Sequence, residues 1–346
     1  MLDFSEISIA GKDPVFLVDA EVFRLYADRF VGKPCLLVEA AEENKQWATV
    51  VRLIDELMER EVDRSACLIG IGGGVVTDIC GFVASIFKRG ISFGFVPTTL
   101  LAMVDASLGG KNGINWRGYK NEVGIIRLPD AIWRDLDFLT TLPKRELYSG
   151  VVELLKVFLI ADADAYRQAV ELFRGQPDVG VLLNSENKAV FCRLVERAVA
   201  IKESIVHQDL RENNRRRLLN FGHTLAHAME RLQMEQDEAD LASGLDCTHG
   251  EAVAWGICRM LALSVRMAGC DPAVAERVRD DFCAMGLSRD FALAARMGKE
   301  LMEAIRQDKK REGEVVHDVL LADIGLPVMV ELSFDELMMA LEEMDN

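Results

Sequence analysis

The sequence predicts two successive domains: an α/β domain built on a parallel sheet, then an all-helical domain. Three observations carry this prediction. A chain of 346 residues is longer than a chain that usually folds around a single hydrophobic core. Up to about residue 130, short apolar runs alternate with helical patterns, which is typical of a parallel sheet. From about residue 147 almost only helical periodicity remains. We expect the domains to span residues 1–146 and 147–346.

Buried strands are expected in the first domain at 15–20, 34–40, 66–71 and 91–99, the last ending at a proline. Amphipathic helices are expected between the first two strands and over 44–60. A glycine turn after the third strand opens another helix within 72–90. Parallel strands place ligands at their carboxyl ends, so function is expected there.

The second domain is expected to consist of helices, with one exception near its end. The helical runs are 147–160, 163–174, 187–207, 215–232, 249–269, 272–285, 289–294 and 297–306. The exception is 315–325, "VVHDVLLADIG", which predicts a short strand or hairpin.

Composition excludes several classes of function. A net charge of −16 argues against nucleic-acid binding, and an anionic substrate would need its own local Lys and Arg cluster. The longest uncharged run has 14 residues and includes a proline, too short to cross a bilayer. The N-terminus lacks the pattern of a secretory signal. Eight scattered cysteines without a CxxC pair predict reduced thiols in a cytoplasmic protein.

The run "IGIGGGVVTD" places Gly72, Gly73 and Gly74 between a strand and a helix. It does not fit GxGxxG, because Val75 occupies the last glycine position. A glycine turn at the start of a helix still suits a pyrophosphate, since the backbone can approach the ligand closely and a helix N-terminus favours an anion. An ordinary tight turn is the alternative. The "EENK" stretch, 42–45, follows a strand and is a weaker candidate for a ribose or adenine contact.

Segment 97–121 is expected to be a glycine-rich ligand-binding loop, because it combines lysines and Asp105 with small residues. A solvated charged loop is the alternative, but it would not need so many glycines.

Three of the five histidines fall within 27 residues. His223 and His227 are four residues apart and therefore share one helix face, with Asn220 and Arg216 expected on successive earlier turns of the same helix. His249 begins a later apolar run. A core histidine beside a solvated one is the alternative for such a pair.

Glu153 and Lys156 are the only charges in the apolar run "SGVVELLKVFLI". A simple i,i+3 ion pair explains them, and so does a buried carboxylate that binds a metal. Glu153 with His223 and His249 would form a Glu-His-His set of the catalytic zinc type. Spacing alone does not prove that these residues assemble.

Eight stretches in order resemble the 3-dehydroquinate synthases and their relatives, the sugar phosphate cyclases, over about residues 15–330. They are "GGGVVTDICGF", "RGISFGFVPTTLLAMVDASLGGKNGIN", "KNEVG", "DFLTTLPKREL", "GVVELLK", "LLNFGHTLAHAME", "HGEAVAWG" and "DKKREG". The resemblance implies an NAD-binding domain followed by a metal-binding helical domain, an active site in the cleft between them, and a homodimer.

In this family NAD⁺ transiently oxidises a ring hydroxyl of 3-deoxy-D-arabino-heptulosonate 7-phosphate, a phosphorylated keto-acid sugar. Phosphate is eliminated, the ketone is reduced again, and the opened ring closes by aldol addition to give 3-dehydroquinate. Zn²⁺ or Co²⁺ acts as the Lewis acid.

The resemblance implies roles for individual residues. The metal ligands are Glu153, His223 and His249. The cofactor residues are Gly73, Gly74, Val75 and Asp78 at the phosphate turn, Thr98, Thr99 and Thr141 nearby, and Asp19, Glu42 and Lys45 at the ribose and adenine end. The contacts to substrate phosphate and hydroxyls are Arg89, Lys111, Asn121, Asn220 and His227. Lys202 and Arg216 hold the substrate carboxylate, while Asp105, Lys120 and Lys156 line the same cleft, Lys120 also contacting the cofactor. Lys309 is a closing phosphate contact, with Lys310 as an alternative.

Several positions depart from the family pattern. The segment "GIIRLP", with Ile126 and Arg127, replaces a usual phenylalanine motif, Thr77 replaces a glycine, and Glu21 stands where asparagine is frequent. Arg127 would add a charge near the cofactor or face solvent. A paralogous cyclase acting on another heptulose phosphate stays open, although His227, Lys202 and Arg216 favour the keto-acid substrate. A metal- and NAD-dependent polyol dehydrogenase and a catalytically inactive scaffold subunit are the remaining alternatives.

Overall fold

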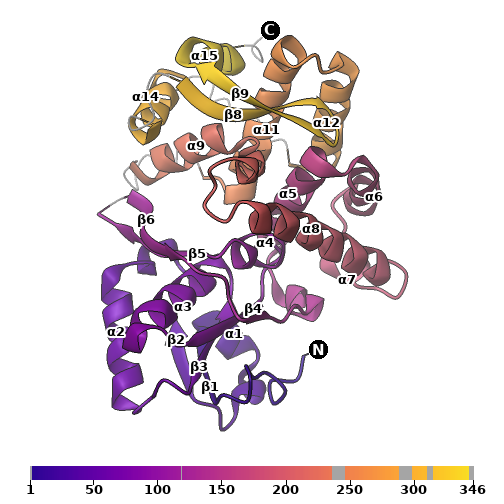
Figure 1. Ribbon diagram of the computed structural model, residues 1–346. Coiled ribbons are helices and arrows are strands. Elements are labelled where there is room, and N and C mark those ends of the chain that lie inside the picture. Colours follow the sequence, from indigo (N-terminus) through magenta and orange to yellow (C-terminus); the bar gives the residue numbers. More distant parts are fainter. Residues whose placement is uncertain (1, 118, 236–245, 288–297, 310–314, 343–346) are drawn as a thin grey trace. The chain divides into compact units, whose positions relative to one another are not determined.

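The computed structural model describes residues 2–117, 119–235, 246–287, 298–309 and 315–342. The chain divides into two compact units, Met1–Gly150 and Val151–Asn346, and the division falls within helix α5 (Lys144–Ala161). Figure 1 shows the elements of each unit.

The first unit is built on a five-stranded parallel sheet with the order β2-β1-β3-β4-β7. Its strands are β1 (Pro14–Asp19), β2 (Cys35–Val38), β3 (Cys67–Gly72), β4 (Ser92–Pro97) and β7 (Ala131–Ile132). All six residues of β3 are buried, as expected for a central parallel strand.

Helices and a β-hairpin complete the first unit. The helices are α1 (Ala20–Leu25), α2 (Trp47–Glu59), α3 (Gly74–Ile86) and α4 (Leu100–Val104), with 3-10 turns η1 (Ala27–Phe30), η2 (Glu42–Asn44), η3 (Phe87–Arg89), η4 (Ala106–Leu108) and η5 (Leu136–Thr141). The antiparallel hairpin consists of β5 (Lys111–Trp116) and β6 (Tyr119–Ile126). Buried side chains of α2 and α3 form one core with those of β1, β3 and β4.

The second unit is mainly helical, so the predicted fold class is confirmed. Its helices are α6 (Ala163–Phe173), α7 (Val179–Leu182), α8 (Lys188–Gln208), α9 (His223–Glu235), α11 (His249–Met267), α12 (Pro272–Ala284), α14 (Gly298–Lys309) and α15 (Phe334–Glu342), with the 3-10 turn η6 (Arg215–Asn220). The hairpin β8 (Val315–Asp323) and β9 (Leu326–Ser333) confirms the strand or hairpin predicted at 315–325. The helix predicted at 289–294 lies outside the described residues.

Two local predictions are wrong. Segment 97–121 is not a loop, because it forms α4, η4 and most of the β5–β6 hairpin. Residues 215–232 do not form one helix, because η6 ends at Asn220 and α9 starts afresh at His223. Gly222 has a φ of +80°, and a β-carbon there would lie 2.7 Å from the backbone nitrogen of Ile257. The close approach to α11 therefore breaks the run.

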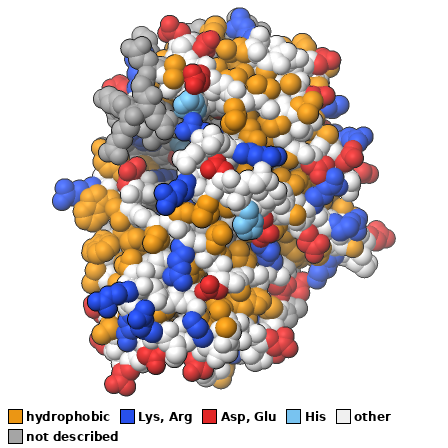
Figure 2. All heavy atoms as spheres, in the orientation of Figure 1, with side chains coloured by type: hydrophobic (Ala, Val, Ile, Leu, Met, Phe, Trp, Pro, Cys, Tyr) orange, Lys and Arg blue, Asp and Glu red, His pale blue; other side chains and the backbone are white. Residues whose placement is uncertain are grey.

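Charged side chains of both signs are interspersed with hydrophobic ones on the face shown in Figure 2. Among the described residues, no helix has both the length and the apolar character needed to cross a bilayer. All eight cysteines are free thiols, five of them buried.

Candidate active site

The glycine turn joins β3 to α3 in the first unit. Gly73 is the N-cap residue of α3, and no side chain caps this terminus. A β-carbon on Gly73 would lie 3.2 Å from Cγ2 of Thr99, and one on Gly74 would lie 3.4 Å from the β-carbon of Ala106. The helix therefore begins with backbone N–H groups that no side chain caps, and added bulk at Gly73 would press on Thr99, which are features that suit a bound pyrophosphate. The chain's turn fits the phosphates of a dinucleotide.

Lys45, Asp78 and Asn121 form a polar network beside this turn. Nζ of Lys45 lies 2.6 Å from Oδ2 of Asp78 and also donates to Oδ1 of Asn121. Lys45 is only 5% exposed. Burial raises the pKa of Asp78 to about 6, although the Lys45 ammonium opposes that rise. The network brings together two predicted cofactor residues and one predicted substrate residue.

Asn121 is held in an uncommon backbone conformation. Its φ is +59°, and its backbone N–H donates to the side chain of Asn115 at 3.0 Å. The Asn115 side chain also donates to the carboxylate of Glu42 at 2.8 Å. Glu42 is thereby connected to the β5–β6 hairpin.

The predicted threonines and Asp19 all lie at ends of elements. Thr98 is buried after β4, and Thr99 caps α4 by accepting from the N–H of Ala102. The Thr141 hydroxyl lies 2.9 Å from that of Tyr26. Asp19 caps α1. Burial raises the pKa of its carboxyl group, although the hydrogen bond from the Glu21 N–H acts to lower it. Strand ends are where ligands bind in parallel sheets.

The remaining predicted residues of this unit lie on the segment after β4, apart from Arg89. Asp105 separates α4 from η4, Lys111 begins β5 and is exposed, and Lys120 lies on β6. Arg89 is exposed at the end of η3 with a φ of +65°.

Arg127, one of the residues that depart from the family pattern, packs within the first unit. Its guanidinium lies 4.8 Å from the ring centre of Phe93 and donates to the carbonyl of Ile91 at 2.9 Å. Thr77 is also internal, since its hydroxyl donates to the carbonyl of Gly74. These two departures therefore have structural roles.

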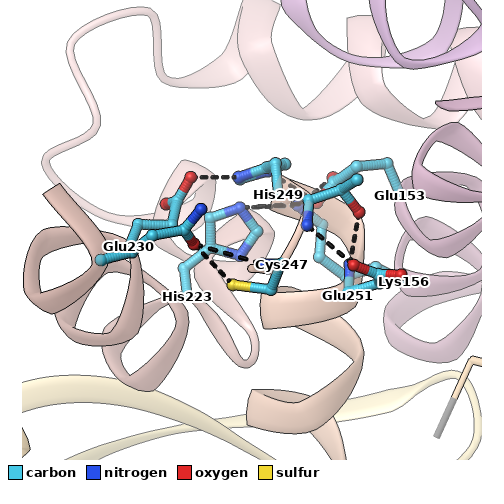
Figure 3. Close-up of polar contacts among 9 residues, drawn as sticks. Glu153, Lys156, His223, Glu230, Cys247, His249 and Glu251 are labelled. Carbon is cyan, nitrogen blue, oxygen red and sulfur yellow. Dashed lines mark hydrogen bonds and ion pairs between the residues drawn. The ribbon is translucent and has the colours of Figure 1, made fainter. Parts of the chain in front are cut away.

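In the second unit, Glu153 on α5, His223 on α9 and His249 on α11 converge. Their candidate ligand atoms all lie within 4.8 Å of one another. Oε1 of Glu153 is 3.6 Å from Nε2 of His223 and 3.4 Å from Nε2 of His249. Both rings thus present the same nitrogen to one carboxylate, as Figure 3 shows.

Lys156 contacts the same cluster. Its Nζ lies 2.5 Å from Oε2 of Glu153 and 3.5 Å from Nε2 of His223. The i,i+3 ion pair and the clustering of ligands are therefore both present. Burial would raise the pKa of Glu153, but Lys156 and His249 outweigh burial and hold it far below its ordinary value. Burial would lower the pKa of His249, but the carboxylates of Glu153 and Glu230 raise it to about 10.

These residues fit a divalent metal ion. Both oxygens of the fully buried Glu153 carboxylate lack a hydrogen-bond donor of good geometry. A buried carboxylate is stabilised by a cation, and one carboxylate oxygen with two imidazole nitrogens is a donor set that suits zinc.

The three consecutive arginines of η6 differ in environment. Arg216 is 4% exposed, and its guanidinium donates to the carbonyl of Leu210 at 2.8 Å. Arg215 is exposed and bonds to Gln208. Lys202 on α8 is 5% exposed, and α8 packs against η6. Arg216 is therefore not a solvated member of a basic run.

Asn220 and His227 have distinct surroundings. The Asn220 amide donates to the carboxylate of Glu212 at 2.6 Å. His227 is exposed on α9, with its ring centre 5.3 Å from that of His223. The expected shared helix face holds for the two histidines, but Asn220 and Arg216 belong to η6. Lys309 ends α14, and Lys310 lies outside the described residues.

Sequence reasoning missed two carboxylates of this region. Glu230 lies on α9 with Oε1 3.4 Å from Nδ1 of His249, and Glu212 binds Asn220. A signal for Glu230 was available, because it lies seven residues, or two helical turns, after His223.

The fold and these clusters define a class: an α/β domain with a phosphate-type glycine turn, followed by a helical domain with a Glu-His-His cluster. Residues 35–149 match the family model for the 3-dehydroquinate synthase N-terminal domain, and residues 150–311 match the C-terminal one. A 3-dehydroquinate synthase of Campylobacter concisus is 34% identical over 333 residues, covering 94% of this chain and 90% of the relative. The chain belongs to the 3-dehydroquinate synthase family, whose members are phosphate-eliminating enzymes.

Two solved cyclases have the same fold. A 2-epi-5-epi-valiolone synthase from Streptomyces hygroscopicus, with NAD⁺ and Zn²⁺ bound, has a TM-score of 0.82 and 26% identity, covering 97% of this chain and 92% of that one. A 2-deoxy-scyllo-inosose synthase complexed with carbaglucose-6-phosphate, NAD⁺ and Co²⁺ has a TM-score of 0.82 and 22% identity, with coverages of 98% and 92%.

Proposed function

We propose that the chain converts 3-deoxy-D-arabino-heptulosonate 7-phosphate into 3-dehydroquinate and phosphate, with NAD⁺ and a divalent metal ion as cofactors. The observation that carries this proposal is the convergence of Glu153, His223 and His249 in a chain of this family. The glycine turn at α3 supports the dinucleotide, because its backbone dipoles and small residues suit a pyrophosphate.

Glu153, His223 and His249 would hold the metal, and the turn at Gly73 and Gly74 would hold the cofactor phosphates. When bound, NAD⁺ supplies a reversible oxidation of a ring hydroxyl, and the metal supplies a Lewis acid at that hydroxyl. Lys156 contributes positive charge beside Glu153, so the buried carboxylate stays ionised and able to bind a cation.

Substrate binding requires cations, because the substrate carries a carboxylate and a phosphate while the chain has a net charge of −16. Burial of Lys202 and Arg216 on two packed elements supports their assignment to the carboxylate, since a guanidinium presents a fork of donors. The proposed contacts to phosphate and hydroxyls are Arg89, Lys111, Asn121, Asn220 and His227, with Lys309 as a closing phosphate contact. Asp105, Lys120 and Lys156 are proposed to line the same site, and Lys120 is also proposed to contact the cofactor.

The network at Lys45 supports the proposed ribose and adenine end of the cofactor site. Lys45 and Asp78 are paired, and Glu42 reaches the hairpin through Asn115. Asp19 completes the proposed ribose and adenine end. Asp78 and Val75, on α3, belong to the proposed phosphate turn, with Thr98, Thr99 and Thr141 proposed to lie nearby.

The direct experiment incubates purified protein with the heptulosonate phosphate, NAD⁺ and Zn²⁺ and measures phosphate and 3-dehydroquinate. We expect both products in equal amounts, a requirement for NAD⁺, and no accumulation of NADH, because the conversion has no net redox change. Stoichiometric NADH formation from a polyol would support a dehydrogenase. Turnover of sedoheptulose 7-phosphate in preference to the keto acid would support a paralogous cyclase.

We also propose a homodimer in the cytoplasm. The dimer rests on the family resemblance, and the eight free thiols support a reducing compartment. Sedimentation equilibrium of the purified protein tests the dimer, and a mass near 38.5 kDa, that of one chain, would refute it.

A further inference from the structure

The metal cluster has a carboxylate neighbour to which no role has been assigned. Glu230 lies on α9 and is 15% exposed, and its Oε1 lies 3.4 Å from Nδ1 of His249. Nε2 of the same ring lies 3.4 Å from Oε1 of Glu153. The His249 ring therefore lies between two carboxylates from two different helices, as Figure 3 shows.

We infer that Glu230 is a positioning residue for the metal site, accepting a hydrogen bond from Nδ1 of His249 and so directing Nε2 of that ring toward Glu153. A carboxylate only accepts, so this contact requires the proton on Nδ1. In the metal-free ring, the contact of Nε2 with Glu153 likewise needs a proton on Nε2, and a bound metal would displace that proton and take the Nε2 lone pair. Metal-binding histidines are commonly held in this way, and the outer partner fixes both tautomer and ring orientation.

The local structure explains why His249 needs such a partner. His249 is the first residue of α11, directly after the N-cap Thr248, whose capping box with Glu251 fixes the backbone there. The side chain of a first helical residue is less enclosed than one in mid-helix, and that of His249 is 28% exposed. The capping box fixes the backbone of His249, and the contact with Glu230 fixes the orientation of its ring.

The other histidine is held differently. Nδ1 of His223 lies 3.4 Å from the backbone carbonyl of Phe221, two residues earlier. His223 is thus oriented by its own chain, whereas His249 depends on a side chain from α9. Because His223 and Glu230 are two turns apart on one helix, α9 provides one proposed ligand and orients a second.

The inference rests on the metal site of the proposed function, and the test separates the two. Zn²⁺ affinity is measured by competition with a chromogenic chelator for the wild type, Glu230→Ala and Glu230→Gln. Removing an outer partner typically costs about 10- to 100-fold in metal affinity. We expect that loss for Glu230→Ala and a smaller one for Glu230→Gln, whose amide oxygen still accepts from Nδ1. The visible spectrum of the Co²⁺-loaded protein should shift in the same order.

Glu331→Gln is the control, because the carboxylate of Glu331 also faces Nδ1 of a histidine, His317, at 3.7 Å, but it is 66% exposed on the β8–β9 hairpin and lies outside the cluster. It should keep wild-type affinity. A role confined to packing would lower the thermal midpoint of the metal-free Glu230 variants while leaving affinity and spectrum at wild-type values, and that result would overturn the inference. A wild type that binds no Zn²⁺ would refute the metal site itself.

Discussion

The glycine turn of the first unit and the Glu-His-His cluster of the second unit are built in opposite ways. The turn is local, because Gly72–Asp78 are contiguous and the groups proposed to bind the cofactor phosphates are backbone N–H groups at the start of α3. The cluster is assembled from side chains on α5, α9 and α11, which are far apart in the sequence. The turn is therefore sensitive to added bulk, and the cluster is sensitive to removal of a side chain.

The two regions also differ in electrostatics. No side chain caps α3 at the turn, so its partial charge comes from the helix itself. The cluster concentrates full charges, with the buried Glu153 beside Lys156 and His249. The contrast can be tested with variants that add bulk at the glycine turn and with variants that remove a charged or metal-binding side chain elsewhere.

The largest effect is expected from His223→Ala. Two remaining ligands do not hold zinc well, so bound metal and turnover should both be lost, with turnover falling by at least about 1000-fold. Metal analysis of the purified variant, together with the phosphate-release assay, measures both. His207→Ala, on the exposed face of α8, is the control and should retain metal. Stoichiometric zinc in His223→Ala would contradict the ligand assignment.

Arg216→Ala is expected to have the next largest effect. Loss of a buried guanidinium that is proposed to bind the substrate carboxylate should cost about 2–4 kcal/mol in transition-state binding, measured as kcat/KM. The exposed Arg215 and the half-buried Arg217 are neighbours on η6, and their alanine variants should be nearly silent. The loss should be much smaller with a heptulose phosphate that has no carboxylate. Equal losses from all three arginines would instead indicate a general role of η6.

Gly73→Val tests the backbone-built region. A β-carbon there would lie 3.2 Å from Thr99, in the space where we propose that the pyrophosphate binds, so NAD⁺ should bind about 10- to 100-fold more weakly, a loss of about 1.4–2.8 kcal/mol. Isothermal titration with NAD⁺ measures this. Gly180→Val on α7 is the control, since nothing lies within 4 Å of a β-carbon at that position. Unchanged NAD⁺ affinity in Gly73→Val would place the cofactor elsewhere.

The same contrast explains how much could be predicted from the sequence. Strand and helix alternation and the glycine turn are local patterns, so β3, α3 and β4 were predicted within a residue or a few. The break at Phe221–Gly222 was missed because it depends on the close approach of Gly222 to α11. The β5–β6 hairpin was missed because its glycines suggested a loop, whereas Gly113 and Gly124 allow two strands to approach closely. The cluster was suggested by residue type and by family resemblance, but only the tertiary fold shows its convergence.

Asp78→Asn should have the smallest effect and tests the charged network beside the turn. Because burial raises the pKa of Asp78 from 3.8 to about 6, the native state binds its proton more tightly than the unfolded chain does. The stabilisation from this proton is fully present below about pH 4 and is lost as the pH rises through about 6. Lys45 at 2.6 Å and the partial exposure of Asp78 limit the size of the effect, so we expect about 1–2 kcal/mol.

Urea unfolding of the wild type and Asp78→Asn between pH 4 and 7 should therefore show the variant gaining stability relative to the wild type as the pH increases. The exposed Asp55→Asn on α2 should show no such trend. A relative loss of stability in Asp78→Asn over the same range would mean that the attraction of Lys45 outweighs burial, and the first unit would then hold its polar network by charge pairing, as the cluster at Glu153 does.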